Sequence, residues 1–187
     1  TDGSITQTFK GDPYYWQVNG YDSLAMTEPV LDCSVHNEAT VWCIEFDSEN
    51  SRLYATDSGR YIASFSPDSN HKWSDDTEGA VTFTFLINQA ELTVTAGLNA
   101  GSLVYGDNTP TFDSIESITD SYWVNFTLLG SAQANQVSFT LSTNYTRGSG
   151  VGSYEIYVDD FSSRNYTLQS TTAGTFSVNK AEITIAG

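Results

Sequence analysis

The segment at residues 87–94 (INQAELTV) returns in similar form at residues 178–185 (VNKAEITI), 91 positions further along the chain. In both copies apolar residues alternate with Glu and Thr, which is the two-residue period of a strand with one buried face. Such a long match at a fixed spacing is typical of an internal repeat. The sequence therefore predicts two copies of one β-rich module.

Shorter anchors repeat in the same order. Residues 59–61 (GRY) correspond to 152–154 (GSY), and the Gly-Asp pair at 11–12 corresponds to the pair at 106–107. The spacing drifts by a few residues, as loop insertions would cause. We expect the copies to meet near residues 88–91.

Taken as modules, the copies span residues 1–89 and 90–187. The first module has no counterpart of the strand that opens the second, so its first strand is apparently missing. A spare strand, residues 181–187, trails the second module. We expect this trailing strand to begin a third copy, and to pair either with the second module or with the first module of a neighbouring molecule.

The charge balance excludes several partners. The chain has 7 basic and 23 acidic residues and a formal net charge of −16. Contacts with nucleic acid or anionic membranes need Lys and Arg to neutralise phosphates, so neither is expected. No apolar run approaches the length that spans a bilayer, so membrane insertion is not expected either.

Copy two resembles the mostly-bacterial Ig-like (MBG) modules. These modules occur in tandem in large bacterial surface proteins and adhesins. The matching stretches are 92–96 (LTVTA), 104–107 (VYGD) with Pro110 behind it, 152–154 (GSY), 165–168 (NYTL) and 178–181 (VNKA). Copy one is similar over 9–11 (FKG) and 59–63 (GRYIA), and its 70–75 (NHKWSD) resembles a hairpin of related bacterial Ig-like repeats, with Asp76 where a Gly is more usual. Copy one also carries two cysteines that the family pattern does not include.

The resemblance implies an all-β chain of two tandem Ig-like β-sandwich modules. The alternative is a pair of β-grasp-like sheets with one short helix each, for which residues 113–119 are the candidate in the second module. Either fold would serve as a spacer or as a binding unit on a cell surface.

Three consecutive aromatic residues, Tyr14, Tyr15 and Trp16, are the candidate ligand-binding residues. Side chains in a strand alternate between its two faces, so Tyr15 points away from Tyr14 and Trp16. One face must then carry an aromatic side chain outside the core, unless the other module covers it. An exposed aromatic ring suits stacking on a sugar, although packing between modules is an equal alternative.

A cluster of oxygen-bearing side chains is the candidate metal site. Hard cations such as calcium take oxygen ligands, and the acidic stretch around residues 68–78 supplies several. The candidate ligands are Asp68, Asn70, Asp75, Asp76 and Glu78. The stretch lacks the spacing of an EF-hand loop, so a plain acidic hairpin is the alternative. No cofactor other than calcium is indicated.

The sequence gives no catalytic constellation. Its two histidines, His36 and His71, lie in polar surroundings, and no Gly-x-Ser-x-Gly motif is present. Cys33 and Cys43 lie close enough in sequence for two neighbouring strands to join them. A disulfide and a pair of reduced, buried cysteines both remain open.

These features together predict a non-enzymatic protein that is extracellular, either secreted or attached to the cell wall. We expect repeat modules of a bacterial surface adhesin that act as a stalk, contact neighbouring repeats of the same chain, and bind a host glycan, mucin or matrix protein. The alternative is a carbohydrate-binding or accessory module of a secreted enzyme.

Overall fold

The chain is all-β, as the sequence predicts. A computed structural model describes residues 5–36, 40–112, 121–132 and 136–185, and within these ranges it leaves out the side chains of residues 33–42. The predicted helix at 113–119 lies outside the described residues. The described part contains no helix with the length and apolar character needed to cross a bilayer.

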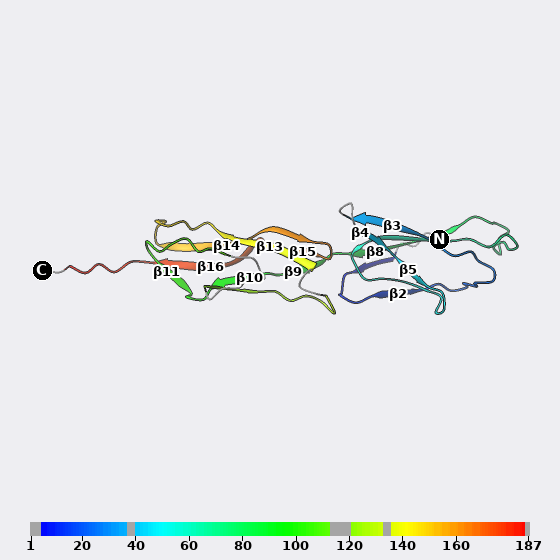
Figure 1. Cartoon of the computed structure of the whole chain (residues 1–187), viewed down its shortest axis with the longest axis horizontal. Helices are drawn as coiled ribbons and strands as arrows, with labels where there is room; N and C mark the ends of the chain where they lie inside the picture. Colours follow the sequence, from blue (N-terminus) through cyan, green and yellow to red (C-terminus); the bar gives the residue numbers. More distant parts are fainter. Residues whose placement is uncertain (1–4, 37–39, 113–120, 133–135, 186–187) are drawn as a thin grey trace. The chain divides into compact units, whose positions relative to one another are not determined.

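The chain forms two compact units. Unit 1 consists of Thr1–Ala90 with Leu129–Ala132, and unit 2 consists of Glu91–Leu128 with Gln133–Gly187. Figure 1 shows the strands of both units. The first eight strands are β1 (Ile5–Thr8), β2 (Tyr14–Gln17), β3 (Val30–His36), β4 (Thr40–Cys43), β5 (Glu45–Asp47), β6 (Arg52–Ala55), β7 (Gly59–Phe65) and β8 (Val81–Asn88).

Eight further strands follow from residue 90 onward. They are β9 (Ala90–Leu92), β10 (Thr95–Leu98), β11 (Ser102–Val104), β12 (Tyr122–Asn125), β13 (Val137–Thr143), β14 (Gly152–Ser163), β15 (Tyr166–Leu168) and β16 (Thr172–Asn179). The larger sheet of unit 2 has the order β11-β16-β14-β13, and two smaller pairs, β10-β12 and β15-β9, accompany it.

Unit 1 has two sheets, with orders β1-β8-β7-β3-β4 and β2-β6-β5. Aromatic side chains from the two sheets meet in its core. The rings of Trp16 on β2 and Phe85 on β8 lie 4.4 Å apart, and those of Phe46 on β5 and Phe65 on β7 lie 5.4 Å apart. Such pairs bury large apolar areas and add directional contacts. Unit 1 is therefore a sandwich of two facing sheets.

The larger sheets of the two units share one strand arrangement. In unit 1, β1 lies parallel to β8, which pairs antiparallel with β7, which in turn pairs antiparallel with β3. In unit 2, β11, β16, β14 and β13 follow in the same order with the same directions. A glycine with positive φ follows each parallel edge strand, Gly11 at 84° and Gly106 at 97°.

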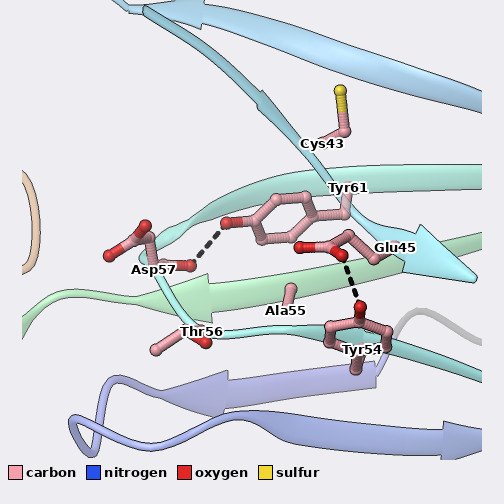
Figure 2. Close-up of a pocket in the computed structure, with 7 residues that line it drawn as sticks. All are labelled: Cys43, Glu45, Tyr54, Ala55, Thr56, Asp57 and Tyr61. Atoms are coloured by element: carbon pink, nitrogen blue, oxygen red, sulfur yellow. Dashed lines mark hydrogen bonds between the residues drawn. The ribbon is translucent and has the colours of Figure 1, made fainter. Parts of the chain in front are cut away.

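A tyrosine corner recurs at the start of β7 and of β14. The Tyr61 hydroxyl donates a hydrogen bond of 2.6 Å to the backbone carbonyl of Asp57 (Figure 2). The Tyr154 hydroxyl donates one of 2.6 Å to the carbonyl of Gly150. In both cases the acceptor lies four residues upstream, so the two Gly-x-Tyr motifs build the same local structure. Tyrosine corners of this kind are common in Ig-like sandwiches.

The trailing strand predicted at residues 181–187 is not a strand over its described part. Residues 180–185 are exposed and pair with no strand of the described chain, and residues 186–187 lie outside the description. Figure 1 shows this segment running on beyond the end of β16. A strand needs a neighbour for its N–H and C=O groups. Among the described residues, no strand supplies these partners to residues 180–185.

Candidate functional site

The alternation along β2 separates the three candidate aromatic residues. Trp16 is only 8% exposed because its ring packs on Phe85, whereas Tyr15 on the opposite face is 53% exposed. Tyr14 is half-buried, and its hydroxyl donates a hydrogen bond of 2.7 Å to the carbonyl of Thr8. The three residues therefore do not form one surface, and Tyr15 is the member that faces solvent.

Strand pairing places Tyr15 in a group of six side chains on the outer face of the sheet β2-β6-β5. In the register of this sheet, Tyr15 lies opposite Tyr54, which lies opposite Glu45. In the next row on the same face, Gln17 lies opposite Arg52, which lies opposite Asp47. We call this group the Tyr15 face: Tyr15, Gln17, Glu45, Asp47, Arg52 and Tyr54.

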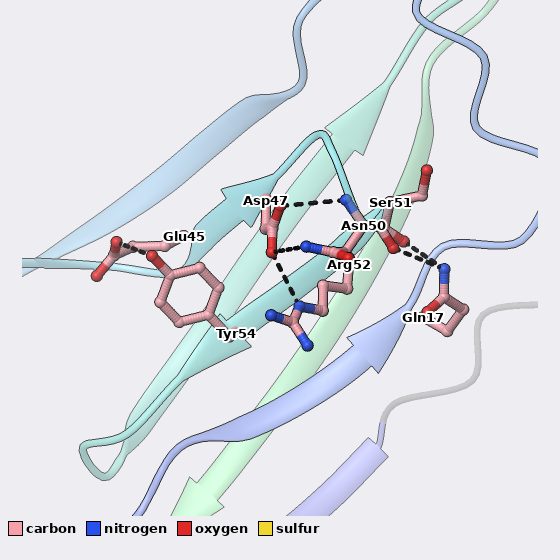
Figure 3. A network of polar contacts seen from close by, with 7 residues as sticks. All are labelled: Gln17, Glu45, Asp47, Asn50, Ser51, Arg52 and Tyr54. Carbon is pink, nitrogen blue, oxygen red and sulfur yellow. Dashed lines mark hydrogen bonds and ion pairs between the residues drawn. The ribbon is translucent and has the colours of Figure 1, made fainter.

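Ring and cation contacts hold Tyr15 in place. The Arg52 guanidinium carbon lies 4.4 Å from the centre of the Tyr15 ring, and the Tyr15 and Tyr54 rings lie 5.8 Å apart. The guanidinium itself is oriented by Asp47, whose carboxylate lies 3.0 Å from its Nε (Figure 3). Because both neighbours restrict the ring, little side-chain entropy remains to be lost when a ligand contacts it.

Hydrogen bonds fix the polar part of the face. The Asp47 carboxylate accepts a bond of 2.8 Å from the Asn50 side-chain amide and one of 3.2 Å from the Asn50 backbone. These bonds, and after them the contact with Arg52, lower the pKa of Asp47. The Gln17 amide donates to the carbonyls of Asn50 at 3.0 Å and of Ser51 at 2.9 Å (Figure 3). Asp47 is therefore a carboxylate at neutral pH, and Gln17 has its amide hydrogens engaged and its carbonyl oxygen left to accept.

Tyr54 lies between two shallow hollows. Its hydroxyl donates a hydrogen bond to the Glu45 carboxylate, which raises the pKa of Tyr54. One hollow, of about 550 Å³, is bordered by Tyr15, Asp47, Arg52 and Tyr54. The other, of about 390 Å³, continues past Tyr54 toward the tyrosine corner (Figure 2). Both volumes fall in the range of small-molecule sites.

The candidate metal ligands lie in a hairpin whose carboxylates bond to the hairpin itself. Asp68 accepts hydrogen bonds from the Asn70 backbone at 2.7 Å and from the His71 ring at 2.6 Å. Asp75 accepts them from the Thr77 hydroxyl at 2.7 Å and from its backbone at 3.1 Å. The contact with His71 lowers the pKa of Asp68, and the bonds from Thr77 lower that of Asp75.

The remaining two acids of this set point elsewhere. Asp76 forms an ion pair of 2.6 Å with Lys72, and Glu78 is exposed. Among the residues that the structure describes, no three His, Cys, Asp or Glu side chains converge as a metal site would require. Of the four carboxylates of this hairpin, those of Asp68 and Asp75 accept hydrogen bonds within its turns.

The two cysteines lie opposite each other in the pairing of β3 with β4. Cys43 is disulfide-bonded, and Cys33 is the only other cysteine in the chain. The side chain of Cys33 lies outside the described part. The sequence left a disulfide and a reduced cysteine pair open, and the structure has Cys43 in a disulfide. Cys43 ends β4, the strand that precedes β5.

Five members of the Tyr15 face were not predicted from the sequence: Gln17, which follows the predicted aromatic residues on β2, and four residues of two other strands. Arg52 and Tyr54 belong to β6 (RLYA), and Glu45 and Asp47 belong to β5 (EFD). Both segments alternate polar with apolar residues, which was the available signal that these side chains share an outward face. Their position beside Tyr15 depends on the pairing of β2 with β6, about 40 residues away along the chain.

Comparison with known families gives a match in the second unit. Residues 92–177 match the family model of the MBG domain (YGX type). The matched range includes Tyr105-Gly106-Asp107, the turn that follows the parallel edge strand β11. Searches of curated proteins and of solved structures gave no match. The family match supports an MBG-type module over residues 92–177.

Proposed function

We propose that this chain is a pair of repeat modules from a bacterial surface adhesin, and that the Tyr15 face of unit 1 binds host glycans. The MBG match suggests a repeat module of a bacterial surface protein. Unit 2 has the role of a stalk module, and unit 1 adds recognition. The observation that carries the proposal is Tyr15, an exposed ring held between Arg52 and Tyr54 amid hydrogen-bonding side chains.

The chemistry of the face suits a sugar. The C–H groups on one side of a pyranose ring pack on an aromatic ring, whose face carries negative charge density. The hydroxyl groups around the sugar need both donors and acceptors. Glu45 and Asp47 supply carboxylate acceptors, and Gln17 supplies a carbonyl oxygen. A shallow polar hollow with one aromatic platform meets both needs.

The charge of the face favours an uncharged glycan. Three carboxylates, from Glu45, Asp47 and Glu49, lie on or beside the large hollow, and Arg52 is the cation among them. Asp47 already neutralises that cation. Sialic acids, uronic acids and sulfated sugars would meet like charge there and on a chain of net charge −16. Neutral hexose-containing mucin chains are the proposed ligands.

A glycan and mucin array tests the proposal. Wild-type protein should bind neutral oligosaccharides in preference to their sialylated or sulfated forms, with little dependence on salt. Tyr15→Ala should reduce binding at least about tenfold, as truncation of an aromatic anchor does, while Tyr15→Trp should retain it. Tyr105→Ala is the matched control, because Tyr105 of unit 2 is also half exposed and lies off the face.

Two outcomes would count against this function. Equal binding by Tyr15→Ala and wild type would remove the Tyr15 face from recognition. A blank array from folded protein would favour a pure spacer. The alternative function, a carbohydrate-binding module of a secreted enzyme, would use the same face. Finding a catalytic domain in the same gene, instead of further repeats, would identify that alternative.

A further inference from the structure

The two hollows that share Tyr54 follow one another along the outer face of the sheet β2-β6-β5. Arg52 and Tyr54 border the large hollow, and Tyr54 and Thr56 border the smaller one. These three residues occupy every second position along β6 and the residue that follows it, so their side chains point to the same face. The hollows are therefore neighbours on one surface, arranged along the direction of the strand.

The smaller hollow has both an apolar interior and a polar border. Ala55 and Tyr61, which are both buried, line it on the inside. Glu45 and Thr56 supply a carboxylate and a hydroxyl at its border, and Figure 2 shows all four side chains together with Tyr54. The Thr56 hydroxyl forms no hydrogen bond with the residues that the structure describes. It can therefore both donate a hydrogen bond to a ligand and accept one.

Tyr54 forms a fixed ridge between the two hollows. Its hydroxyl donates to the Glu45 carboxylate, and its ring lies 5.8 Å from the ring of Tyr15. These contacts restrict the ring from both sides. A molecule that fills both hollows must cross Tyr54, and the negative face of an aromatic ring suits the C–H groups of a sugar chain that passes over it.

The surface is longer than one sugar ring. Thr56 lies four positions after Arg52, and a strand rises about 3.4 Å per residue, so the two positions lie about 14 Å apart. The hollows measure about 550 Å³ and 390 Å³, and each falls in the range of a small-molecule site. A single sugar bound at Tyr15 would leave the smaller hollow to water.

From these observations we infer that the Tyr15 face takes a linear oligosaccharide that lies along β6. One sugar packs on Tyr15 in the large hollow, and a neighbouring sugar of the same chain occupies the smaller hollow. The inference rests on the proposed function, because it extends the same site. Thr56 and Glu45 then select the second sugar, since both can hydrogen-bond its hydroxyl groups.

A titration series followed by NMR tests the inference. The ¹⁵N-labelled chain is titrated with single neutral hexoses and with neutral mucin oligosaccharides that have been separated by length. Affinity should rise at least about tenfold from single hexoses to the longer chains, because the second contact forms within a molecule that is already bound. Signals near Tyr15 should shift with both ligands, whereas those of Glu45 and Thr56 should shift only with the longer chains.

Variants separate the two hollows. Thr56→Tyr places a ring in the smaller hollow, so it should abolish the gain in affinity with length and leave single hexoses bound as in wild type. Thr167→Tyr, at an exposed strand position of unit 2, is the matched control and should keep the gain. Tyr15→Ala should weaken the binding of both ligands.

Failure of the inference differs from failure of the proposed function. Equal affinity of wild type for single hexoses and longer chains overturns the second sugar position but leaves the Tyr15 face as a sugar site. The same holds for longer chains that shift no signal at Glu45 or Thr56, and for a Thr56→Tyr variant that keeps the gain. If folded wild type binds neither class of sugar, the proposed function is wrong and the inference is wrong with it.

Discussion

Gly174 is the position at which a single methyl group tests how the two layers of unit 2 pack. It lies in β16, directly beneath the backbone of β10, and an added Cβ would be 2.0 Å from the Ala96 carbonyl oxygen and 3.2 Å from its carbon. Ordinary contacts of a Cβ begin near 3.4 Å. The Gly174→Ala variant must therefore move β10 by more than about 1 Å, against the hydrogen bonds that pair β10 with β12.

The cost of this movement follows from the atoms involved. Overpacking a well-packed site costs typically about 1–3 kcal/mol, and here the obstacle is backbone, which yields less than a side chain. We expect a loss of about 3 kcal/mol in the free energy of unfolding of unit 2. For a unit of this size, each kcal/mol lowers Tm by about 4–8 °C, so its transition should fall by more than about 10 °C.

Scanning calorimetry of wild type, Gly174→Ala and Gly150→Ala measures the effect. Gly150 is the matched control, because nothing lies within 4 Å of a Cβ placed there. The control should be neutral or slightly stabilised, since alanine restricts the unfolded chain. If Gly174→Ala unfolds within about 0.5 kcal/mol of Gly150→Ala, β10 does not lie on β16 and the described packing of unit 2 is incorrect.

Three further perturbations probe unit 1 and the recurring corner. Asp47→Asn should lower the stability of the protein to urea at neutral pH. Because hydrogen bonding from Asn50 lowers the folded-state pKa of Asp47, the difference in stability between wild type and variant should shrink as pH falls below about 4. A difference that does not depend on pH would contradict this. Tyr61→Phe should lower the free energy of unfolding, measured by calorimetry, by about 1 kcal/mol. Tyr154→Phe should lower it by less, because the equivalent hydrogen bond is exposed. The reverse order would contradict the burial of the tyrosine corner at Tyr61. Reduction of the disulfide at Cys43 should cost roughly 2–4 kcal/mol, seen as a fall in the Tm of unit 1 alone; an unchanged Tm would show that it does not constrain the unit.

The strand content could be read from sequence because it depends on local alternation. The pattern in residues 81–87 and 136–141 needs no knowledge of neighbours, and β8 and β13 occupy those regions. The same alternation separated Tyr15 from Trp16. Period-two reasoning therefore predicted that Tyr15 and Trp16 lie on opposite sides of their strand, and the structure shows that the side of Trp16 is the buried one.

The composition of the Tyr15 face could not be predicted in this way. Arg52 and Tyr54 reach Tyr15 through pairing between β2 and β6, and register between distant strands is a tertiary property. The acidic hairpin shows the converse. The sequence predicts a cation site from Asp68, Asn70, Asp75, Asp76 and Glu78, and the sequence alone does not show that Asp68 and Asp75 each accept hydrogen bonds from their own turn.

The trailing segment marks a third limit. Its sequence repeats residues 90–94, of which Ala90–Leu92 form β9, but a strand exists only where a partner edge is present. Residues 181–185 lack that partner within the described chain. The local sequence of residues 181–185 favours a strand, but a strand also requires a neighbouring strand edge with which to pair.

Chemical-shift mapping of the ¹⁵N-labelled chain with the neutral oligosaccharide fraction released from mucin tests the central claim most directly. Saturable shifts should cluster on β2, β5 and β6, with the largest near Tyr15, Arg52 and Tyr54, and they should vanish in Tyr15→Ala while that variant keeps its dispersed spectrum. Shifts that cluster on unit 2, or an unchanged spectrum at saturating oligosaccharide, would contradict glycan recognition by the Tyr15 face.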